Sequence, residues 1–253
     1  MKTNGNESLG PLANVLKNMT FTHSGTSEPD PTPDSSCPRC HGVGFMRSRA
    51  VLGEPGFGRA IACDCQIGMA RSAFLARLPK GMSFASFRPK PFQAKAFGLA
   101  QQFADGSLPT PWLVLQGSFG TGKTHLGVAI LRAMAERNTV GAFWVVADLL
   151  DYFRAGLRDR DGVDEGMDRA VSVRESLGPL VLDDFGRHTT TEWVREELYQ
   201  LVDYRMRREM PTIVTSNLPL DQLDGALGSR LGDTHRVTVC VMAGVDMRRE
   251  ARP

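Results

Sequence analysis

Long apolar stretches are missing from this 253-residue sequence. It has no run of about 18 or more apolar residues, and its first ten residues, MKTNGNESLG, contain no apolar segment of the secretory type. We therefore expect a cytoplasmic protein that neither spans a membrane nor enters the secretory route. Cysteines are few, five in all, which favours metal binding or buried thiols over structural disulfides. With 42% hydrophobic and 23% charged residues, the composition excludes wholesale disorder, collagen-like and coiled-coil classes.

Charge is unevenly distributed along the chain. Residues 34–92 carry nine Lys and Arg against three Asp and Glu, whereas residues 93–253 carry nineteen against twenty-two. The basic segment suits a polyanion or an acidic partner, and a solvated cationic linker is the alternative. Residues 1–36 are rich in Pro, Ser, Thr and Asp. They predict a disordered tail, because such a segment cannot bury enough apolar surface to offset its ordering entropy.

Short apolar runs alternate with helical patterns from residue 93 onward. A helix is clearest at Thr190–Met210, where apolar residues recur at three- and four-residue spacing and Thr189 with Glu192 is placed for a capping box. A shorter helix is expected from about Ile67 to Leu78. This alternation predicts an α/β fold with a five-stranded parallel sheet. The predicted strands are Trp112–Gln116, Ala142–Ala147, Pro179–Asp183, Thr212–Ser216 and Arg236–Met242.

A glycine-rich loop stands between the first of these strands and the helix that follows it. The loop, GSFGTGKT, fits the pattern G-x-x-x-x-G-K-[ST] at every fixed position. Its glycines allow backbone N–H groups to approach a phosphate, beside the positive end of the helix dipole. Lys123 would add charge at the β- and γ-phosphates, and the Thr124 hydroxyl would hold Mg²⁺. The expected nucleotide contacts are Gly117, Ser118, Phe119, Gly120, Thr121, Gly122, Lys123 and Thr124.

Two consecutive carboxylates end the apolar segment Leu180-Val-Leu-Asp183-Asp184. Asp183 is expected to hold Mg²⁺, directly or through water, and Asp184 to polarise the attacking water. Consecutive strand residues point to opposite sides, which would allow the two different tasks. Asn217, just after the strand Thr212–Ser216, would orient the water or read the γ-phosphate.

Four of the cysteines form two short-spaced pairs, Cys37-Pro-Arg-Cys40 and Cys63-Asp-Cys65, with 22 residues between the pairs. This spacing predicts a tetrahedral zinc site with four thiolates, and His41 is a possible substitute for one of the second pair. Redox-active thiols and plain buried cysteines are the alternatives. A module of this size has too small a core to fold unaided, so the metal would provide much of its stability.

The segments GSFGTGKTHL, LVLDD, TIVTSN and GSRL together resemble AAA+ ATPases. More narrowly, they resemble the DnaC/DnaI-type replicative helicase loaders, with IstB as a close relative, over roughly residues 80–250. The resemblance implies that Asn217 is the sensor 1 residue and Arg230 an arginine finger acting on a neighbouring subunit's nucleotide. Arg248 would be the sensor 2 residue, with Arg249 second. Asp184 departs from the family's usual Glu, which predicts slow hydrolysis or hydrolysis timed for switching.

The resemblance also implies a function and a domain plan. We expect an ATPase that uses ATP, Mg²⁺ and Zn²⁺, assembles through its ATP site, and places a hexameric DnaB-type helicase on single-stranded DNA. The zinc module would contact the helicase, although its charge equally suits DNA. Two alternatives stay open: an IstB-like transposition ATPase acting on duplex DNA, and a zinc adaptor with non-hydrolysed nucleotide. The expected domains are the tail 1–36, a zinc module 37–66, a helix and connector 67–92, and an AAA+ domain with a reduced lid 93–253.

Overall fold

The computed structural model describes residues 37–48, 51, 54, 57–158, 163–186 and 191–244, with the backbone alone for 156–158 and 163–168. The predicted tail 1–36 and the two arginines Arg248 and Arg249 lie outside these ranges. The chain divides into two compact units, within residues 1–77 and 78–253, and each is described by itself. The finer domain boundaries at 66 and 92 remain predictions. None of the helices in the described ranges is long and apolar enough to cross a lipid bilayer.

The first unit consists of a cysteine-containing turn, a small hairpin and a helix. Strands β1 (Phe45–Arg47) and β2 (Ala60–Ala62) pair antiparallel, and helix α2 (Asp64–Arg77) follows directly. The helix expected near residues 67–78 is therefore present but begins earlier, at Asp64. An acidic side chain in the first turn is favourable there, because it faces the positive end of the helix dipole.

The second unit is built on a five-stranded sheet in which every neighbouring pair is parallel. The strand order is β4-β5-β6-β3-β7, so β3 lies between the last two strands of the chain. The predicted five-stranded parallel sheet is confirmed. The strand bounds are β3 (Trp112–Gly117), β4 (Ala142–Val145), β5 (Leu180–Phe185), β6 (Thr212–Ser216) and β7 (Val237–Met242).

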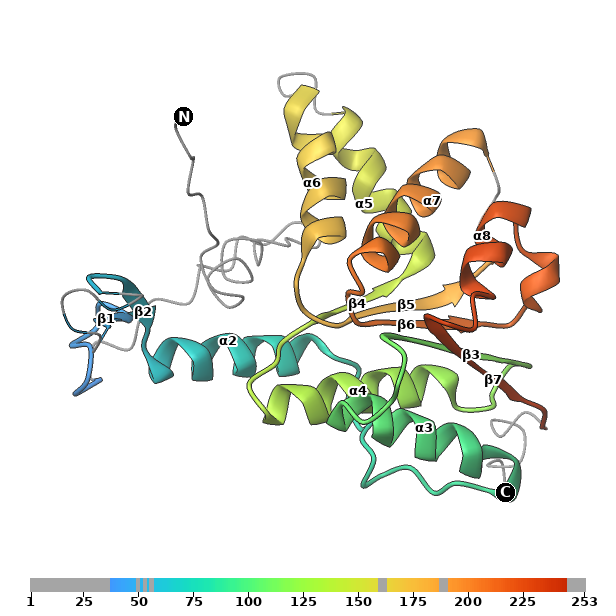
Figure 1. Cartoon of the computed structure of the whole chain (residues 1–253), viewed down its shortest axis with the longest axis horizontal. Coiled ribbons are helices and arrows are strands. Elements are labelled where there is room, and N and C mark those ends of the chain that lie inside the picture. The colour runs from blue at the N-terminus through green and yellow to red at the C-terminus, as the bar shows by residue number, and fades with distance from the viewer. Residues whose placement is uncertain are drawn as a thin grey trace. The chain divides into compact units, whose positions relative to one another are not determined.

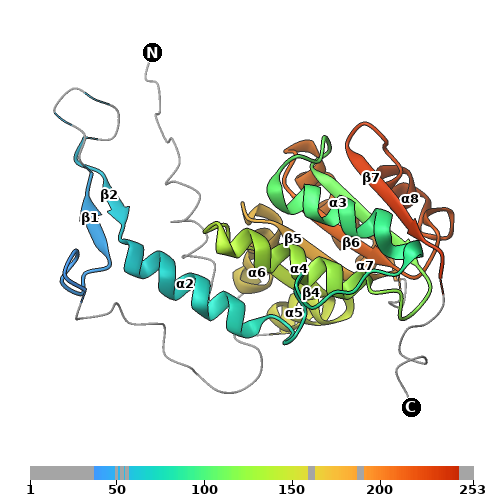
Figure 2. The same cartoon turned by 90° about the horizontal axis from the view of Figure 1, so that it is seen from below.

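Helices cover both faces of this sheet (Figures 1 and 2). Helices α3 and α4 lie on one face, and α5, α6, α7 and α8 lie on the other. Burial on both faces explains why the strand sequences are continuously apolar rather than alternating, as in β3, where Trp112 to Leu115 are fully buried. The bounds are η1 (Pro91–Gln93), α3 (Ala94–Asp105), α4 (Lys123–Glu136), α5 (Val146–Arg158), α6 (Val163–Glu175), α7 (Glu192–Arg207), η2 (Leu220–Gln222) and α8 (Gly225–Leu231).

Helix α7 confirms the apolar period read from the sequence but corrects its start. The apolar positions of the period are all buried, namely Val194, Leu198, Leu201, Val202 and Met206. The N-cap residue is Thr191, whose side chain accepts a hydrogen bond from the N–H of Val194 over 3.3 Å. The capping box expected from Thr189 and Glu192 is therefore wrong, because Glu192 is the first helical residue and not the third. Thr189 itself lies outside the described residues.

Parallel pairing brings the carboxyl ends of the strands to a single edge of the sheet. β3 is in register with β6, so that Gln116 lies opposite Ser216, and β6 pairs in turn with β5. The glycine loop after β3, the carboxylates at the end of β5 and the polar end of β6 therefore meet at this edge. Ligand sites of open α/β sheets are found at such edges.

Candidate functional site

The phosphate loop, Gly117–Thr124, joins the end of β3 to the start of α4. Glycine is required at both ends of the turn. A Cβ at Gly117 would lie 2.4 Å from the carbonyl oxygen of Met242, and one at Gly122 would lie 2.8 Å from the Phe87 ring. Gly122 also has φ +95°, a left-handed conformation that residues with a side chain rarely adopt. The loop is thus held in one path by β7 on one side and by Phe87 on the other.

Lys123 is the first residue of α4, and its side chain is directed back along the loop. Its ammonium donates hydrogen bonds to the carbonyl oxygens of Gly117 (2.8 Å) and Ser118 (2.7 Å), and the residue is only 6% exposed. The fully buried Thr121 donates to the carbonyl oxygen of Ser118 over 2.9 Å. Phe119, by contrast, is 49% exposed. The geometry therefore gathers a cationic group and the positive end of a helix dipole within one loop.

The two residues predicted to hold magnesium are in direct contact. The Thr124 hydroxyl donates to the Asp183 carboxylate, 2.9 Å from one oxygen and 3.1 Å from the other. Burial raises the pKa of Asp183, whereas hydrogen bonds from the hydroxyls of Thr215 and Thr124 act in the opposite direction. A carboxylate beside a hydroxyl matches the oxygen ligands that Mg²⁺ takes. Thr124 and Asp183 therefore fit a magnesium ion.

Asp184 interrupts the regular strand. Its φ is +58°, and the β5–β6 register is shifted between Leu182 and Phe185, which marks a β-bulge. The expectation that Asp183 and Asp184 alternate as in a regular strand is therefore wrong. The bulge leaves the Asp184 N–H bonded to the Thr215 hydroxyl at 3.0 Å. The side-chain amide of Asn217 donates to the Asp184 carboxylate, so the structure brings these two predicted residues together.

Two functional candidates escaped the sequence reasoning. Thr215, on β6, contacts both residues of the acidic pair, and Gln93 contacts the phosphate loop. The Gln93 amide donates to the carbonyl oxygen of Thr121 and accepts from the N–H of Lys90, each over 2.8 Å. Gln93 is only 3% exposed. A buried polar residue on a strand beside an acidic strand was the available signal for Thr215, whereas no sequence pattern singles out Gln93.

Among the described residues, Arg230 forms no hydrogen bond or ion pair with the phosphate loop or with the acidic pair Asp183 and Asp184. It belongs to α8, and its Nη2 forms an ion pair with Asp203 (2.7 Å) and a hydrogen bond to the Tyr199 hydroxyl (3.1 Å), both on α7. The Tyr199 hydrogen bond raises the pKa of Arg230 above its usual range. The predicted finger is thus placed on a surface helix, and Arg248, the sensor 2 candidate, lies outside the described residues.

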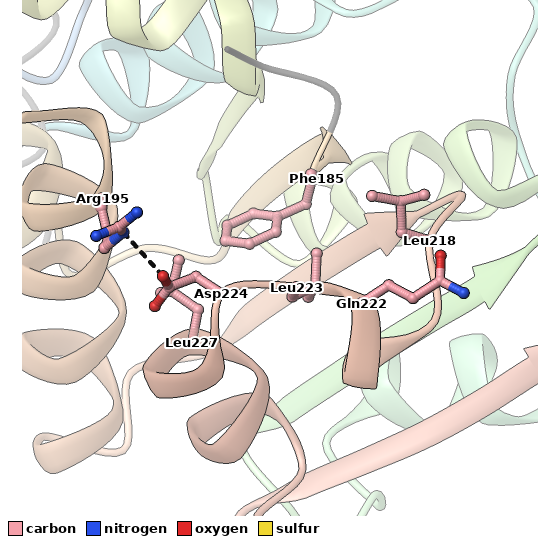
Figure 3. A pocket seen from close by; sticks show the side chains of 8 residues that line it. Phe185, Arg195, Leu218, Gln222, Leu223, Asp224 and Leu227 are labelled. Atoms are coloured by element: carbon pink, nitrogen blue, oxygen red, sulfur yellow. Dashed lines mark ion pairs between the residues drawn. The ribbon is translucent and has the colours of Figure 1, made fainter. Parts of the chain in front are cut away.

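A shallow pocket lies at the end of β5, beside α8 (Figure 3). An ion pair of 2.8 Å between Arg195 and Asp224 stands at one side, and apolar side chains form most of the rest. No residue of the phosphate loop lines it, so it is separate from the nucleotide site. The lining residues are Phe185, Gly186, Arg195, Leu218, Gln222, Leu223, Asp224 and Leu227.

The four cysteine sulfurs of the first unit converge as the spacing predicted. Their Sγ atoms all lie within 4.8 Å of one another, and His41 is not part of the group. Cys37 and Cys63 are 3.8 Å apart, and Cys40 and Cys65 are 3.4 Å apart. Sulfurs around a tetrahedral zinc at ~2.3 Å lie ~3.8 Å from one another, so the four residues fit this metal. Backbone N–H groups of Cys40 and Arg39 lower the pKa of Cys37 to about 7, whereas burial raises the pKa of Cys65 to about 12, so the zinc charge itself would have to deprotonate Cys65.

The fold and the loop together define the class of protein. A parallel sheet of this strand order, with a phosphate loop after β3 and two carboxylates at the end of β5, which β6 separates from β3, is that of AAA+ ATP-binding proteins. The chain belongs to the family of IstB-like ATP binding proteins, whose model matches residues 110–238. The family resemblance read from the sequence is confirmed.

Homologous proteins include replicative helicase loaders. The chain is 30% identical to the replicative helicase loader DnaI of Bacillus subtilis over 112 residues, 44% of this chain and 34% of that protein. It is 26% identical to the replicative helicase loader DnaC of Escherichia coli over 164 residues, 63% of this chain and 65% of that one. A crystal structure of the DnaC helicase loader superposes with a TM-score of 0.51 and 26% identity, covering 64% of this chain and 97% of the other.

A further relative comes from a mobile element. The chain is 33% identical over 107 residues to a putative ATP-binding protein in an insertion sequence of Mycobacterium tuberculosis, which is 42% of this chain and 40% of that protein. The chain thus spans less than two thirds of the length of each of these relatives.

Proposed function

We propose that this protein is an ATP-dependent helicase loader. It binds a hexameric DnaB-type replicative helicase and places it on single-stranded DNA, with ATP as the switch that controls assembly. The observation that carries the proposal is homology to two proteins named as replicative helicase loaders, DnaI and DnaC. The conjunction of a phosphate loop with a cysteine cluster of zinc geometry in one chain supports it further.

The residues of the ATP site have different tasks. Loop N–H groups and Lys123 bind the phosphates, and Thr124 with Asp183 holds the magnesium ion. Bound Mg²⁺ supplies positive charge that offsets the charge of the phosphate oxygens. Asp184, held by the amide of Asn217, accepts a proton from the attacking water and orients it. The short Asp side chain makes turnover slow, which suits a switch better than a motor.

Assembly follows from the position of Arg230. It lies on α8, where its described bonds are to α7 and not to the phosphate loop of its own subunit. An arginine so placed serves the nucleotide of a neighbouring subunit, where its planar cation offsets charge on the γ-phosphoryl group. ATP turnover then depends on contact between subunits. Arg248, with Arg249 as the second candidate, is assigned to sensor 2 by family resemblance alone.

The zinc module is proposed to bind the helicase. Its hairpin exposes apolar side chains that a small metal-bound domain does not need for its own core, including Phe45 (45% exposed), Ile61 (44%) and Val43 (67%). Exposed apolar groups of this kind are typical of protein–protein contacts. Arg47, on β1, and Arg59, which directly precedes β2, belong to the same hairpin and would complement an acidic partner surface.

Co-purification tests this proposal directly. The full chain is bound to resin and incubated with a purified DnaB-type hexamer, with ATP and Mg²⁺, before and after zinc is removed by a chelator. We expect retention of the hexamer that is lost on chelation and lost in Phe45→Ser, while Val241→Ser, an exposed apolar position on β7, retains it. Absence of helicase binding by zinc-loaded protein contradicts the proposal. If the module binds DNA and not the helicase, its positive charge serves nucleic-acid binding.

The insertion-sequence relative favours a second candidate function, an IstB-like transposition ATPase acting on duplex DNA. The two functions differ in the DNA they need. A loader places helicase on single strands and requires the helicase, whereas a transposition ATPase assembles on duplex DNA without one. ATP-dependent assembly on duplex DNA in the absence of helicase would favour the second function. A zinc adaptor with non-hydrolysed nucleotide would bind ATP without measurable single-turnover hydrolysis.

A further inference from the structure

We propose that Asp203 and Tyr199 of α7 are positioning residues for Arg230. They hold its guanidinium by Nη2 and leave the N–H groups of Nη1 to bind the γ-phosphate of a neighbouring subunit. The inference rests on the proposed function of Arg230 and adds the residues that make it work.

Helix α8 is short, and two ion pairs attach it to α7. At its beginning, Asp224 caps the helix by accepting from the Ala226 N–H (3.2 Å) and pairs with Arg195 at 2.8 Å, the contact drawn in Figure 3. At its end, Arg230 pairs with Asp203 at 2.7 Å. Leu227 and Leu231 are buried between these points, at 3% and 0% exposure. The helix that bears Arg230 is therefore fixed at both ends against a single neighbouring helix.

Asp203 is a shared carboxylate. Its side chain is 13% exposed and forms ion pairs with Arg230 through Oδ1 and with Arg207 through Oδ2, each at 2.7 Å, the Oδ1 contact being one of charge without hydrogen-bond alignment. Arg207 lies on the same helix and is itself 62% exposed, so it neutralises the second oxygen without closing the site. Tyr199 accepts from Arg230 Nη2 over 3.1 Å, and its ring centroid lies 5.7 Å from the guanidinium carbon. Both anchors thus act on the same nitrogen of Arg230.

The rest of the guanidinium carries no such contact. Within the described part of the chain, neither Nε nor Nη1 of Arg230 has a bonded partner, and the side chain is 36% exposed. Nη1 carries two N–H groups, which remain to donate to phosphate oxygens. A free arginine side chain loses rotamer freedom when it is immobilised. Holding Nη2 beforehand removes part of that loss when the phosphate arrives.

The competing explanation is that the ion pair only stabilises the fold. The two explanations differ in which subunit of an interface the substitution affects. If Asp203 acts through Arg230, it matters only in the subunit that supplies the finger. If it merely stabilises the α7–α8 contact, its replacement affects a subunit in either role. The test therefore needs a mixture of two variants, one that supplies only the arginine finger and one that supplies only the ATP site.

Such a mixture combines two disabled full-length chains. Lys123→Ala has an ATP site too weak to fill at the ATP concentration used but keeps its finger, and Arg230→Ala keeps its ATP site but lacks the finger. Neither hydrolyses ATP alone, whereas the mixture regains turnover at interfaces where the two meet. We expect Asp203→Asn to lower this turnover about tenfold when placed in the Lys123→Ala chain and to leave it within about twofold when placed in the Arg230→Ala chain.

Matched variants complete the design. Tyr199→Phe, which keeps the ring but removes the acceptor, should lower turnover about threefold in the finger-supplying chain. Arg207→Gln removes the other arginine from the same carboxylate and should leave turnover unchanged. Should Asp203→Asn not fold, Tyr199→Phe carries the test by itself.

The outcomes distinguish failure of the inference from failure of the proposed function. No turnover in the parent mixture means that Arg230 does not act between subunits, and the proposed function fails at that point. An active parent mixture in which Asp203→Asn and Tyr199→Phe have no effect overturns the inference alone. Equal loss of turnover with Asp203→Asn in either chain also overturns it, because the residue is then structural.

Discussion

Thr215 and Asp183 lie on adjacent strands and share a hydrogen bond of 2.6 Å, in which the Thr215 hydroxyl donates to Asp183 Oδ1. The same hydroxyl accepts from the N–H of Asp184 over 3.0 Å. One buried side chain therefore fixes both a proposed magnesium ligand and the backbone of the neighbouring acid. The bulge at Asp184, with its left-handed φ, is stabilised from β6 by this contact. Local strain at functional sites persists when surrounding contacts hold it.

Thr215→Val should slow hydrolysis more than it weakens nucleotide binding. Valine has the same shape but removes both the acceptor of the Asp184 N–H and the shorter of the two hydrogen bonds to Asp183 Oδ1, at a cost of about 1–3 kcal/mol in stability. We expect single-turnover hydrolysis to fall about tenfold, measured by quenched flow with saturating ATP. Thr215→Ser retains the hydroxyl and should restore most of the rate. Equal rates for the valine and wild-type proteins would show that the contact has no part in hydrolysis.

Asp184→Glu tests the role of the shorter carboxylate. The longer side chain reaches one methylene further toward the water, so single-turnover hydrolysis should rise, or at least not collapse. Asp184→Asn serves as the comparison, and its rate should drop by about 100-fold because the amide cannot accept the proton. Complete loss of hydrolysis in Asp184→Glu would mean that Asp184 is not the base.

The positions of the strands along the chain and the chemistry of their ends could be predicted because both depend on local pattern, whereas the order of the strands within the sheet depends on contacts between distant segments. Apolar runs ending in Gly117, Asp183 and Ser216 indicated where the strands end. Parallel pairing then brings these ends together at one edge of the sheet. The bulge at Asp184 could not be read in this way. A bulge depends on the partner strand, and nothing in LVLDD distinguishes it from a regular strand end.

Zinc removal should unfold the cysteine module and leave the ATP-binding domain folded. Metal analysis of the full chain is expected to find about one zinc ion per chain, lost in Cys65→Ser and retained in Cys240→Ser. Cys240 is the control because it is buried on β7, away from the cluster in sequence. A full zinc content in Cys65→Ser, or none in the wild type, would contradict the four-thiolate site.

A buried arginine stabilises the end of the sheet where the strands begin, opposite to the nucleotide site. Arg205, on α7, is fully buried and donates five hydrogen bonds. Its acceptors are neutral, among them the carbonyl oxygens of Gly178 (2.9 Å) and Pro211 (3.0 Å), which precede β5 and β6. Burial lowers the pKa of Arg205 to about 9, so the side chain still carries its charge at neutral pH.

Arg205→Met should therefore destabilise the domain by about 3 kcal/mol, since the buried carbonyl groups lose their donors. Urea unfolding followed by tryptophan fluorescence measures the change. The neighbouring Arg208 is exposed and stacks on Tyr204 at 3.8 Å. Its replacement by Met should cost less than about 1 kcal/mol. Equal effects of the two substitutions would show that the Arg205 network adds little.

Arg205 and Arg230 also show where sequence reasoning ends. Both lie on helices, where an arginine on the surface is the ordinary expectation. The sequence singles out Arg230 only because GSRL resembles a family motif. It gives no reason to single out Arg205. The partners that give each its role, Asp203 for one and backbone carbonyls for the other, come from other elements and become visible only in three dimensions.

Binding of nucleotide at the phosphate loop is the claim from which the rest follows, and isothermal titration calorimetry with ATP and Mg²⁺ measures it most directly. The folded wild-type chain is predicted to bind, and Lys123→Ala to bind about 10- to 100-fold more weakly through loss of a charge-assisted contact. Absence of binding by folded wild-type protein, or equal affinity of the two proteins, would contradict the account.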